Sequence, residues 1–407
     1  MNREEALARD AADPLGHMRA RFLLPEGLFY LDGNSLGPLP AHTPALIADA
    51  VTRQWGRDLI RSWNTADWIG APQRIGAKIA PLIGAAPHEV IVADSVSVNL
   101  FKLLAAALAL RPSRATILTE PGNFPTDLYI ANGLAATIPG VRVQAADLAD
   151  IPAALGSDVA VLLLTHVHYK SAHRRDMAGL TAAAHAAGAL VLWDLSHSAG
   201  AVAFDLNGAG ADLAVGCGYK YLNGGPGAPS FLFAAERHHA AIATPLTGWL
   251  GHAAPFAFVD DYKPAPGMTR FLAGTPPMLS MLALEAGVDL FADVDMRAVE
   301  AKSRTLGDLL IAHLAKTAPD LVLASPRDPA QRGSHLVFRH PHAYEICQCL
   351  IERGVVGDFR APDLWRAGLT PLTLSHAEVW DAASIVGDVM ATRAWDEPRF
   401  RVRARVT

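Results

Sequence analysis

Cysteine is scarce in this chain of 407 residues, and the three that occur form no recognisable pattern. Cys217 stands alone, and Cys347 and Cys349 are separated by a single residue. Such a number and spacing provide neither a disulfide framework nor the ligand spacing of a zinc site. We therefore expect a protein of a reducing compartment.

Two further absences narrow the class of protein. The sequence has no run of about 18 uninterrupted apolar residues, and its N-terminus, Met1-Asn-Arg-Glu-Glu, lacks the apolar stretch of a signal peptide. It also lacks an excess of positive charge, because its formal net charge is −5. The expectation is a cytoplasmic protein with neither a membrane nor a nucleic acid as its partner.

Short apolar runs are what the sequence has in abundance. Hydrophobic residues make up 51% and charged residues 18%, as in an ordinary globular protein. Apolar runs such as 159–165 and 189–193 alternate with helical patterns, which predicts an α/β fold with a mostly parallel central sheet covered by helices. After Pro276-Pro277 the pattern changes to that of a smaller α+β domain. We expect a large domain over residues 45–280 and a small domain over 281–407, completed by the N-terminal segment 1–44.

Residues 188–227 carry the clearest functional signal. A buried-type run ends in Asp194, and Lys220 follows 26 residues later, between two tyrosines and before a glycine-rich turn. A pyridoxal phosphate (PLP) enzyme needs a lysine that forms a Schiff base and an acid that keeps the pyridine nitrogen protonated. Open α/β sheets bind ligands at the carboxyl ends of their strands, where Asp194 is predicted to lie. We favour a PLP site over the alternatives, which are an exposed loop lysine and an aspartate that caps a turn.

Two other segments could complete a PLP site. Residues 94–99 lie between a predicted strand and an apolar helix, so backbone N–H groups and a hydroxyl could bind the phosphate, with Tyr219 adding a phenol donor. Ordinary helix capping by Ser95 or Ser97 is the alternative. Residues 123–127 follow another strand, where Phe124 could stack on a pyridine ring or simply pack in a turn.

The histidine-rich segment 165–173 raises the question of a metal site. His166 and His168 share one face of an extended stretch, but no acidic or cysteine residue accompanies them at ligand spacing. We therefore predict no metal, and the sequence assigns no role to His173 either. Cys347 and Cys349 fall on a predicted amphipathic helix over 344–353, where packing is the expected role.

Together these motifs resemble those of one enzyme family, kynureninase. The similarity runs from about residue 25 to 375, and the segments that carry it are Gly33-Asn-Ser-Leu-Gly37, Phe124-Pro-Thr-Asp127, Asp194-Leu-Ser-His197, Tyr219-Lys220-Tyr-Leu-Asn-Gly-Gly-Pro-Gly227, Gly248-Trp249 and Phe271-Leu-Ala-Gly-Thr275. The resemblance implies a PLP-dependent homodimer of fold-type I. Its implied reaction is the hydrolysis of L-kynurenine, with the 3-hydroxy form as a further candidate, to the anthranilate product and L-alanine by Cβ–Cγ cleavage. This reaction serves tryptophan catabolism and NAD biosynthesis.

The resemblance also implies a role for individual residues. Lys220 is expected to form the Schiff base and to move the Cα proton, Asp194 to pair with the pyridine nitrogen, and Tyr219 to transfer a proton. The expected cofactor-binding residues are Val96, Ser97, Phe124, Asp127, Thr165, Asp194, His197, Tyr219 and Lys220, joined by Trp249 and Thr275 from the second subunit. The expected substrate-binding residues are Arg366, Trp63, Asn64 and Ser35. A bidentate guanidinium suits the substrate carboxylate, and the alternative for Arg366 is a surface ion pair.

One departure and two rival interpretations remain. The phosphate turn reads Asp94-Ser-Val-Ser where many members of the family have Asn-Ala/Ser-Leu-Thr, although serine retains the hydroxyl. The nearest rival is another fold-type I enzyme, an aminotransferase or a cysteine desulfurase. A desulfurase needs a thiolate on a mobile loop, whereas Cys347, at about the right distance after Lys220, lies on a predicted helix. A non-catalytic PLP-binding regulator is the rival from a different class, and the intact set of Lys220, Asp194 and Arg366 argues against it.

Overall fold

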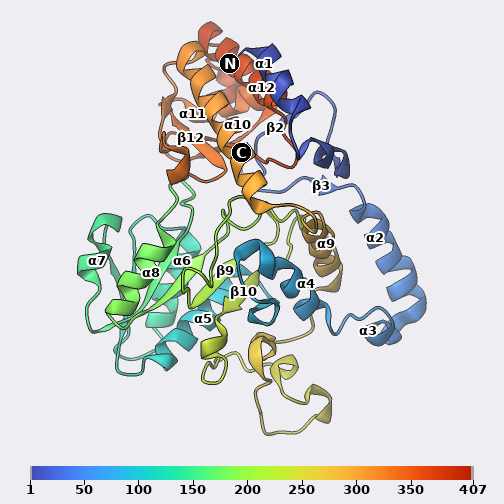
Figure 1. Cartoon of the computed structure of the whole chain (residues 1–407), viewed down its shortest axis with the longest axis vertical. Helices are drawn as coiled ribbons and strands as arrows, with labels where there is room; N and C mark the ends of the chain where they lie inside the picture. The colour runs from blue at the N-terminus through green and yellow to red at the C-terminus, as the bar shows by residue number, and fades with distance from the viewer. Residues whose placement is uncertain (1, 405–407) are drawn as a thin grey trace.

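The chain folds into two lobes, each built around its own β-sheet (Figure 1). The structure is a computed structural model that describes residues 2–404. Strands between residues 90 and 234 form the sheet of the larger lobe, and strands between residues 322 and 368 form that of the smaller lobe. The domain boundaries expected from the sequence stay a prediction.

The larger sheet has seven strands in the order β4-β10-β9-β8-β7-β5-β6. Only β10 runs antiparallel to its neighbours, β4 and β9. This arrangement confirms the predicted α/β fold with a mostly parallel sheet. The strands are β4 (Val90–Val92), β5 (Thr116–Thr119), β6 (Arg142–Ala145), β7 (Val159–Thr165), β8 (Leu190–Asp194), β9 (Leu213–Gly216) and β10 (Phe231–Ala234).

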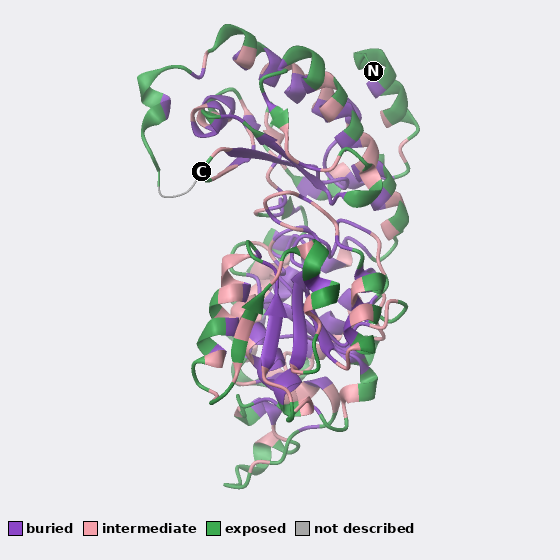
Figure 2. Cartoon of the chain, turned by 90° about the vertical axis from the view of Figure 1, so that its left-hand side faces the viewer, coloured by how far each residue is buried: buried purple, intermediate pink, exposed green. Residues whose placement is uncertain are grey.

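Alternate residues of these strands point to opposite faces of the sheet, and each face has its own apolar core. In β8, Leu190 and Leu192 pack with α5 (Val96–Leu110) and α6 (Pro125–Ala135). Val191 and Trp193 pack on the other face with α4 (Ala71–Ile79), α8 (Met177–Ala186) and α9 (Met278–Asp289). Figure 2 shows the result, a sheet of buried strands enclosed by helices that are exposed on their outer sides.

The smaller lobe combines an antiparallel sheet with long helices. Its strands β11 (Val322–Leu323), β12 (His335–Arg339), β15 (Leu364–Gly368) and β14 (Asp358–Arg360) lie in that order. The helices are α10 (Met296–Thr317), α11 (Ala343–Glu352) and α12 (His376–Thr392). The N-terminal segment belongs to this lobe, because Ala6 and Leu31 lie in its core and β2 (Phe29–Tyr30) pairs with β13 (Val355–Val356).

A helical arm leads from the N-terminal segment to the larger lobe. It comprises α2 (Thr43–Asp49), a π-helical stretch (Ala50–Asp58) and α3 (Ser62–Thr65), and runs along the side of the molecule (Figure 1). The remaining short elements are α1 (Arg3–Ala11), α7 (Ile151–Ala154), β1 (Phe22–Leu23) and β3 (Leu39–Pro40). Within residues 2–404, every helix is too short or too polar to cross a bilayer.

Candidate active site

The predicted cofactor residues meet because they follow strands that point the same way. Thr165 and Asp194 end β7 and β8 as register partners, so the two side chains are neighbours at one edge of the sheet. Ser95 follows β4, Phe124 follows β5, and Lys220 follows β9. Since β10 runs in the opposite direction, it presents its beginning at this edge, where Ser230 lies.

These segments enclose a cavity of about 230 Å³. Eight of the nine cofactor-binding residues expected from the same subunit line it, namely Val96, Ser97, Phe124, Thr165, Asp194, His197, Tyr219 and Lys220. The lining also includes Ser95, which the sequence offered only as a helix cap, and residues that it did not assign to the site: Thr126, Tyr169, Ser196, Cys217, Ala228 and Ser230. Thr126, Ser196 and Cys217 stand within two residues of a predicted one, so proximity in sequence was a usable signal; Tyr169, Ala228 and Ser230 had none.

The Lys220 side chain points into this cavity. Only 8% of the residue is exposed, so the alternative of an exposed loop lysine is wrong. Its Nζ lies 3.4 Å from His197 Nε2 and 5.7 and 5.8 Å from the ring centroids of Phe124 and Tyr219. Burial, with a smaller effect of Lys220, lowers the pKa of His197 well below its usual value. A neutral imidazole can accept a hydrogen bond from the amine.

The turn 33–37 supports the lysine loop from outside. The Gly37 N–H donates to the Tyr219 carbonyl over 2.8 Å. A Cβ at Gly37 would lie 2.2 Å from the Lys220 carbonyl oxygen, so any larger residue would displace the loop. The glycine therefore fixes the position of the loop that carries the amine.

Two buried acids lie opposite the lysine. Asp194 Oδ1 accepts a hydrogen bond from the Ser196 N–H over 2.8 Å, so this acid caps the following turn as well. The Thr165 hydroxyl contacts Asp127 Oδ2 at 3.3 Å, while Asp127 Oδ1 is buried without a partner. Burial raises the pKa of Asp194, and burial together with Asp194 raises the pKa of Asp127 well above its usual value. A cationic ring with an N–H group would relieve both acids, so these residues fit the pyridine ring of PLP.

The opposite end of the cavity suits a phosphate. The first turn of α5 carries Ser97, whose Oγ lies 2.6 Å from Thr126 Oγ1, and helix N-termini attract anions. Beneath it, the fully buried Lys102 amine binds the Asp94 carboxylate and donates to the Phe271 carbonyl over 2.6 Å. This ion pair holds Asp94 at the start of the turn with a φ of 46°. The serine-containing turn thus retains the groups that a phosphate requires.

Replacing Asp194 with asparagine should separate cofactor binding from folding. An acid whose pKa is raised in the folded state favours folding when protonated, and this contribution is lost as pH rises through that pKa. The cofactor-free Asp194→Asn protein should therefore melt at least as high as the wild type, by a margin that grows as pH rises until the pKa of folded Asp194 is passed. Its affinity for PLP should fall about 10- to 100-fold, because a charge-assisted hydrogen bond is worth about 1.5–3 kcal/mol. Thermal melts and a PLP titration measure both, and a lower melting temperature with unchanged affinity would contradict the assignment.

Arg366 lies in the interior, on β15, and only 1% of it is exposed. The alternative of a surface ion pair is therefore wrong. Its Nε and NH2 bind the two oxygens of Asp358 over 2.7 and 2.5 Å, and its NH1 donates to the Tyr169 carbonyl over 2.8 Å. NH2 also donates to Ser35 Oγ over 3.2 Å. The guanidinium thus lies next to Tyr169, which lines the cavity, and it also contacts the predicted Ser35.

Seven predicted residues do not line the cavity of their own chain. Asp127 and Arg366 hydrogen-bond to the lining residues Thr165 and Tyr169, and Ser35 to Arg366.

The other four predicted residues belong to other parts of the chain. Trp63 and Asn64 lie on α3 in the helical arm, where Trp63 packs edge-to-face on Trp68 at 5.9 Å. Trp249 is 41% exposed and Thr275 is exposed. In the single chain none of these four side chains lines the 230 Å³ cavity.

The structure gives the histidine-rich segment structural roles. His166 is buried with its ring edge-to-face on Phe204 at 5.0 Å. His168 contacts the Gly122 carbonyl at 2.9 Å, and His173 contacts Arg175 at 2.6 Å. Residues 2–404 contain no cluster of three histidine, cysteine or acidic side chains suited to a metal.

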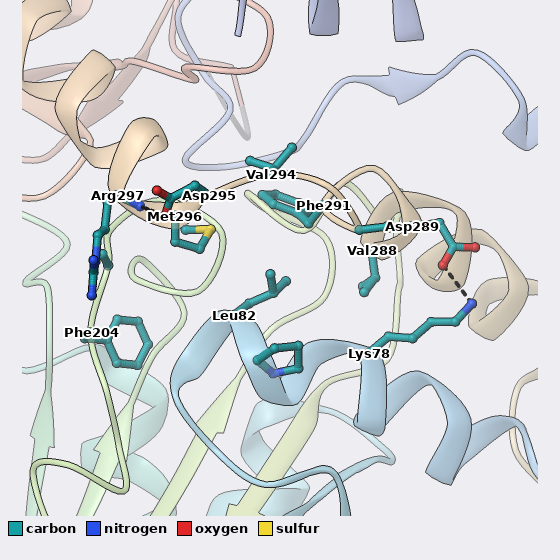
Figure 3. Close-up of a pocket in the computed structure, with 13 residues that line it drawn as sticks. Lys78, Leu82, Phe204, Val288, Asp289, Phe291, Val294, Asp295, Met296 and Arg297 are labelled. Atoms are coloured by element: carbon teal, nitrogen blue, oxygen red, sulfur yellow. Dashed lines mark hydrogen bonds and ion pairs between the residues drawn. The ribbon is translucent and has the colours of Figure 1, made fainter. Parts of the chain in front are cut away.

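A larger cavity of about 500 Å³ lies at the junction of α9 and α10 (Figure 3). Its lining is mostly apolar and includes Leu82, Phe204 and Phe291. The Lys78 amine on its rim is already paired with Asp289 over 2.7 Å and with Glu285. None of the predicted site residues lines this cavity, so it is not the catalytic centre.

Comparison with known proteins identifies close relatives of the chain. A family model described as "Kynureninase C-terminal domain" matches residues 299–386. The chain is 50% identical over 414 residues to the kynureninase of Burkholderia mallei (strain SAVP1), covering 100% of this chain and 99% of the relative. It is 52% identical over 391 residues to the kynureninase of Deinococcus radiodurans, covering 94% and 95% of the two chains.

Solved structures of lower sequence identity have the same fold as this chain. The apo cysteine desulfurase of Thermococcus onnurineus NA1 superposes with a TM-score of 0.77 at 18% identity, covering 92% of this chain and 98% of that one. A mutant of C-DES with glycine covalently linked to its PLP cofactor gives a TM-score of 0.79 at 17% identity, covering 91% and 99%. These likenesses confirm the predicted PLP fold-type I architecture.

Proposed function

The chain belongs to the kynureninase family, and on this premise we propose that it hydrolyses L-kynurenine to anthranilate and L-alanine with PLP as cofactor. The observation that carries the proposal is the single cavity in which Lys220, Asp194, Phe124 and the first turn of α5 meet. We further propose a cytoplasmic enzyme of tryptophan catabolism, divided into the domains 45–280 and 281–407 with 1–44.

The residues of the cavity divide the work of holding PLP. Lys220 would attach the cofactor through its amine, Phe124 would pack against the ring, and Ser97 with Tyr219 would hold the phosphate. Asp194 would keep the ring nitrogen protonated, and Asp127, Thr165 and His197 would lie around the ring. When bound, PLP supplies an electron sink for the bonds at the substrate's Cα.

Proton transfers then fall to two neighbouring side chains. The Lys220 amine, once displaced by the substrate amine, is placed to take the Cα proton. Cys217, then burial and Asp194, raise the pKa of Tyr219, so its hydroxyl keeps its proton in the neutral range. Tyr219 therefore acts as a donor, either to the phosphate or to the carbon atom from which anthranilate departs.

Substrate recognition is assigned to Arg366 and Ser35 at the carboxylate end. Asp358 occupies the Nε–Nη2 edge of the guanidinium, and on its other side Nη1 and Nη2 donate to the Tyr169 carbonyl and to Ser35 Oγ. An incoming carboxylate would take the place of these two neutral acceptors. A planar, bidentate donor is well suited to this task. Trp63 and Asn64 are assigned to the aromatic end of the substrate.

A homodimer accounts for the residues that lie away from the cavity. Trp249 and Thr275 are exposed, so they are available to the site of a second subunit. Large apolar side chains are also exposed, including Trp55 and Ile60 on the arm and Phe256, whose ring packs on Trp249 at 5.8 Å. Exposed apolar patches of this kind mark protein interfaces.

Mixed dimers test whether each site is shared. One subunit type carries Lys220→Ala, and the other carries Trp249→Ala with Thr275→Ala; each homodimer should be nearly inactive. A hybrid dimer has one site with Lys220, Trp249 and Thr275 all intact, so random mixing should restore about a quarter of wild-type activity. Anthranilate fluorescence measures the recovery, and the absence of any recovery on mixing would show that the sites are self-contained.

Release of fluorescent anthranilate from L-kynurenine by the PLP-loaded protein tests the proposed reaction. We expect turnover without any added keto acid. The control variant Lys316→Ala should turn over L-kynurenine at the wild-type rate, because Lys316 lies exposed on α10. A requirement for a keto acid would favour an aminotransferase instead.

The desulfurase alternative finds no support in the position of its cysteine. Cys347 is fully buried in α11, and its thiol contacts the Gly357 carbonyl at 3.5 Å. Burial raises the pKa of Cys347, which disfavours a thiolate. It lines no part of the 230 Å³ cavity.

A further inference from the structure

A compact charge cluster surrounds the guanidinium of Arg366. Asp358 and Arg366 are register partners on the neighbouring strands β14 and β15. Arg360 NH2 also binds Asp358 Oδ2 over 2.7 Å. Asp32, which follows β2, is the second acid of the group and interacts with both arginines. With both acids ionised, two positive and two negative charges balance.

The two acids differ in how well they are held. Asp358 accepts from Arg366 twice, from Arg360 and from the Ser35 hydroxyl over 3.0 Å. Asp32 Oδ1, by contrast, is buried without a hydrogen-bond partner. An incoming substrate carboxylate would add a third negative charge to this buried cluster, and an unbalanced buried charge is costly. Asp32 is the group that can remove the excess charge by taking a proton.

We propose that Asp32 is a positioning residue for substrate recognition, which takes up a proton as the carboxylate binds to Arg366 and so offsets the negative charge that the substrate brings. The proposal rests on the assignment of Arg366 under the proposed function. It adds that carboxylate binding is linked to pH through a residue that does not itself touch the substrate.

The surroundings of Asp32 favour the protonated form. Burial, followed by repulsion from Asp358, raises the pKa of Asp32 to about 7, against the effect of the Ser35 side chain and the attraction of Arg366 and Arg360. The other titratable groups that face the cluster are Tyr30, Tyr221, Cys347, His197 and His335. Burial raises the pKa of both tyrosines and of the thiol, and it lowers the pKa of both histidines, so all five are neutral near pH 7.

The direction of the pH effect follows from linkage. A ligand that favours protonated Asp32 binds with constant affinity below about pH 7 and more weakly above it. Above about pH 7 the affinity should fall by up to about tenfold per pH unit, until the pH passes the pKa that Asp32 has in the complex. Proton uptake should be greatest in the same interval and approach about one proton per site.

The probe is 4-oxo-4-phenylbutanoate, which carries the carboxylate, ketone and ring of kynurenine but no amine to react with PLP. Calorimetric titration of the holoenzyme between about pH 6 and 9, in phosphate and in HEPES, gives the affinity and the number of protons taken up. Protonation of the cofactor itself is followed separately by its visible absorbance. The wild type should show uptake and the pH-dependent loss, whereas Asp32→Asn should bind with little change in affinity across this range and take up no proton through this group.

Controls keep the outcomes distinct. Asp388→Asn makes the same change of charge at an exposed ion pair on α12 and should behave as the wild type. An infrared band of a protonated carboxyl should appear when the probe binds to the wild type and be missing in Asp32→Asn, a readout that a purely structural role would not change.

Binding that depends on Arg366 but brings no proton uptake, or equal uptake in Asp32→Asn, would overturn this inference alone. Binding that is unaffected by Arg366→Leu, or no binding at all, would remove Arg366 as the carboxylate site and this inference with it.

Discussion

Replacement of Lys220 with alanine should abolish both the visible absorbance of attached PLP and the release of anthranilate. The amine is the only lysine nitrogen that lines the 230 Å³ cavity in the described part of the chain. It is assigned two tasks, attachment of the cofactor and transfer of the Cα proton, and loss of a general base alone costs about 10²- to 10⁴-fold in rate. An absorbance titration with PLP and the fluorescence assay measure the two losses.

The control for this variant is Lys316→Ala, which removes an exposed lysine far from the cavity in sequence and on the outer surface of α10. It should leave both readouts at the wild-type level. A Lys220→Ala protein that still shows the absorbance of covalently attached PLP would refute the assignment of this residue.

Replacement of Arg366 should raise KM for L-kynurenine far more than it lowers kcat. The carboxylate loses two charge-assisted hydrogen bonds at about 1.5–3 kcal/mol each, so KM should rise at least about 100-fold in Arg366→Leu. The leucine variant also leaves Asp358 buried without its bidentate partner, which costs about 3–5 kcal/mol of stability. Its folding must therefore be checked by thermal melting.

Arg366→Lys avoids that difficulty because it keeps the positive charge and loses only the planar fork. We expect a smaller rise in KM, about tenfold, from the loss of one directed hydrogen bond. An unchanged KM in both folded variants would show that the substrate carboxylate binds elsewhere.

The larger sheet and the cofactor end of the site were predictable because they depend on local patterns. Each strand that carries a cofactor residue is a short buried run, and β8 ends at Asp194 as expected. Since parallel strands present their carboxyl ends at one edge, the loops after β5, β7, β8 and β9 had to meet. Sequence order alone was enough to bring Phe124, Asp194 and Lys220 together.

The substrate end was only partly predictable because it depends on contacts between distant segments. The strand β15 reads Leu-Trp-Arg-Ala-Gly, and its central arginine hides the apolar pattern of a buried strand. Nothing local indicates that Asp358 binds Arg366 or that Tyr169, 197 positions earlier, supplies a carbonyl. The orphaned oxygen of Asp32 is likewise a result of packing that no motif encodes.

The resemblance implied roles for residues that the sequence pattern alone did not indicate, and the structure shows how exposed those residues are. It implied that Trp249 and Thr275 act in the second subunit, which stays a prediction; both side chains are exposed in the single chain. The histidine-rich segment, which neither pattern nor resemblance explained, has separate packing and hydrogen-bonding roles around β7.

The central claim is the hydrolytic cleavage of the Cβ–Cγ bond of L-kynurenine, and oxygen-18-enriched water tests it most directly. The PLP-loaded protein is incubated with L-kynurenine in this water without any keto acid, and both products are analysed by mass spectrometry. Anthranilate with one heavy oxygen in its carboxylate, released in equal amounts with L-alanine, is the result expected from hydrolysis. Anthranilate without the label, or consumption of kynurenine without L-alanine, would contradict the account.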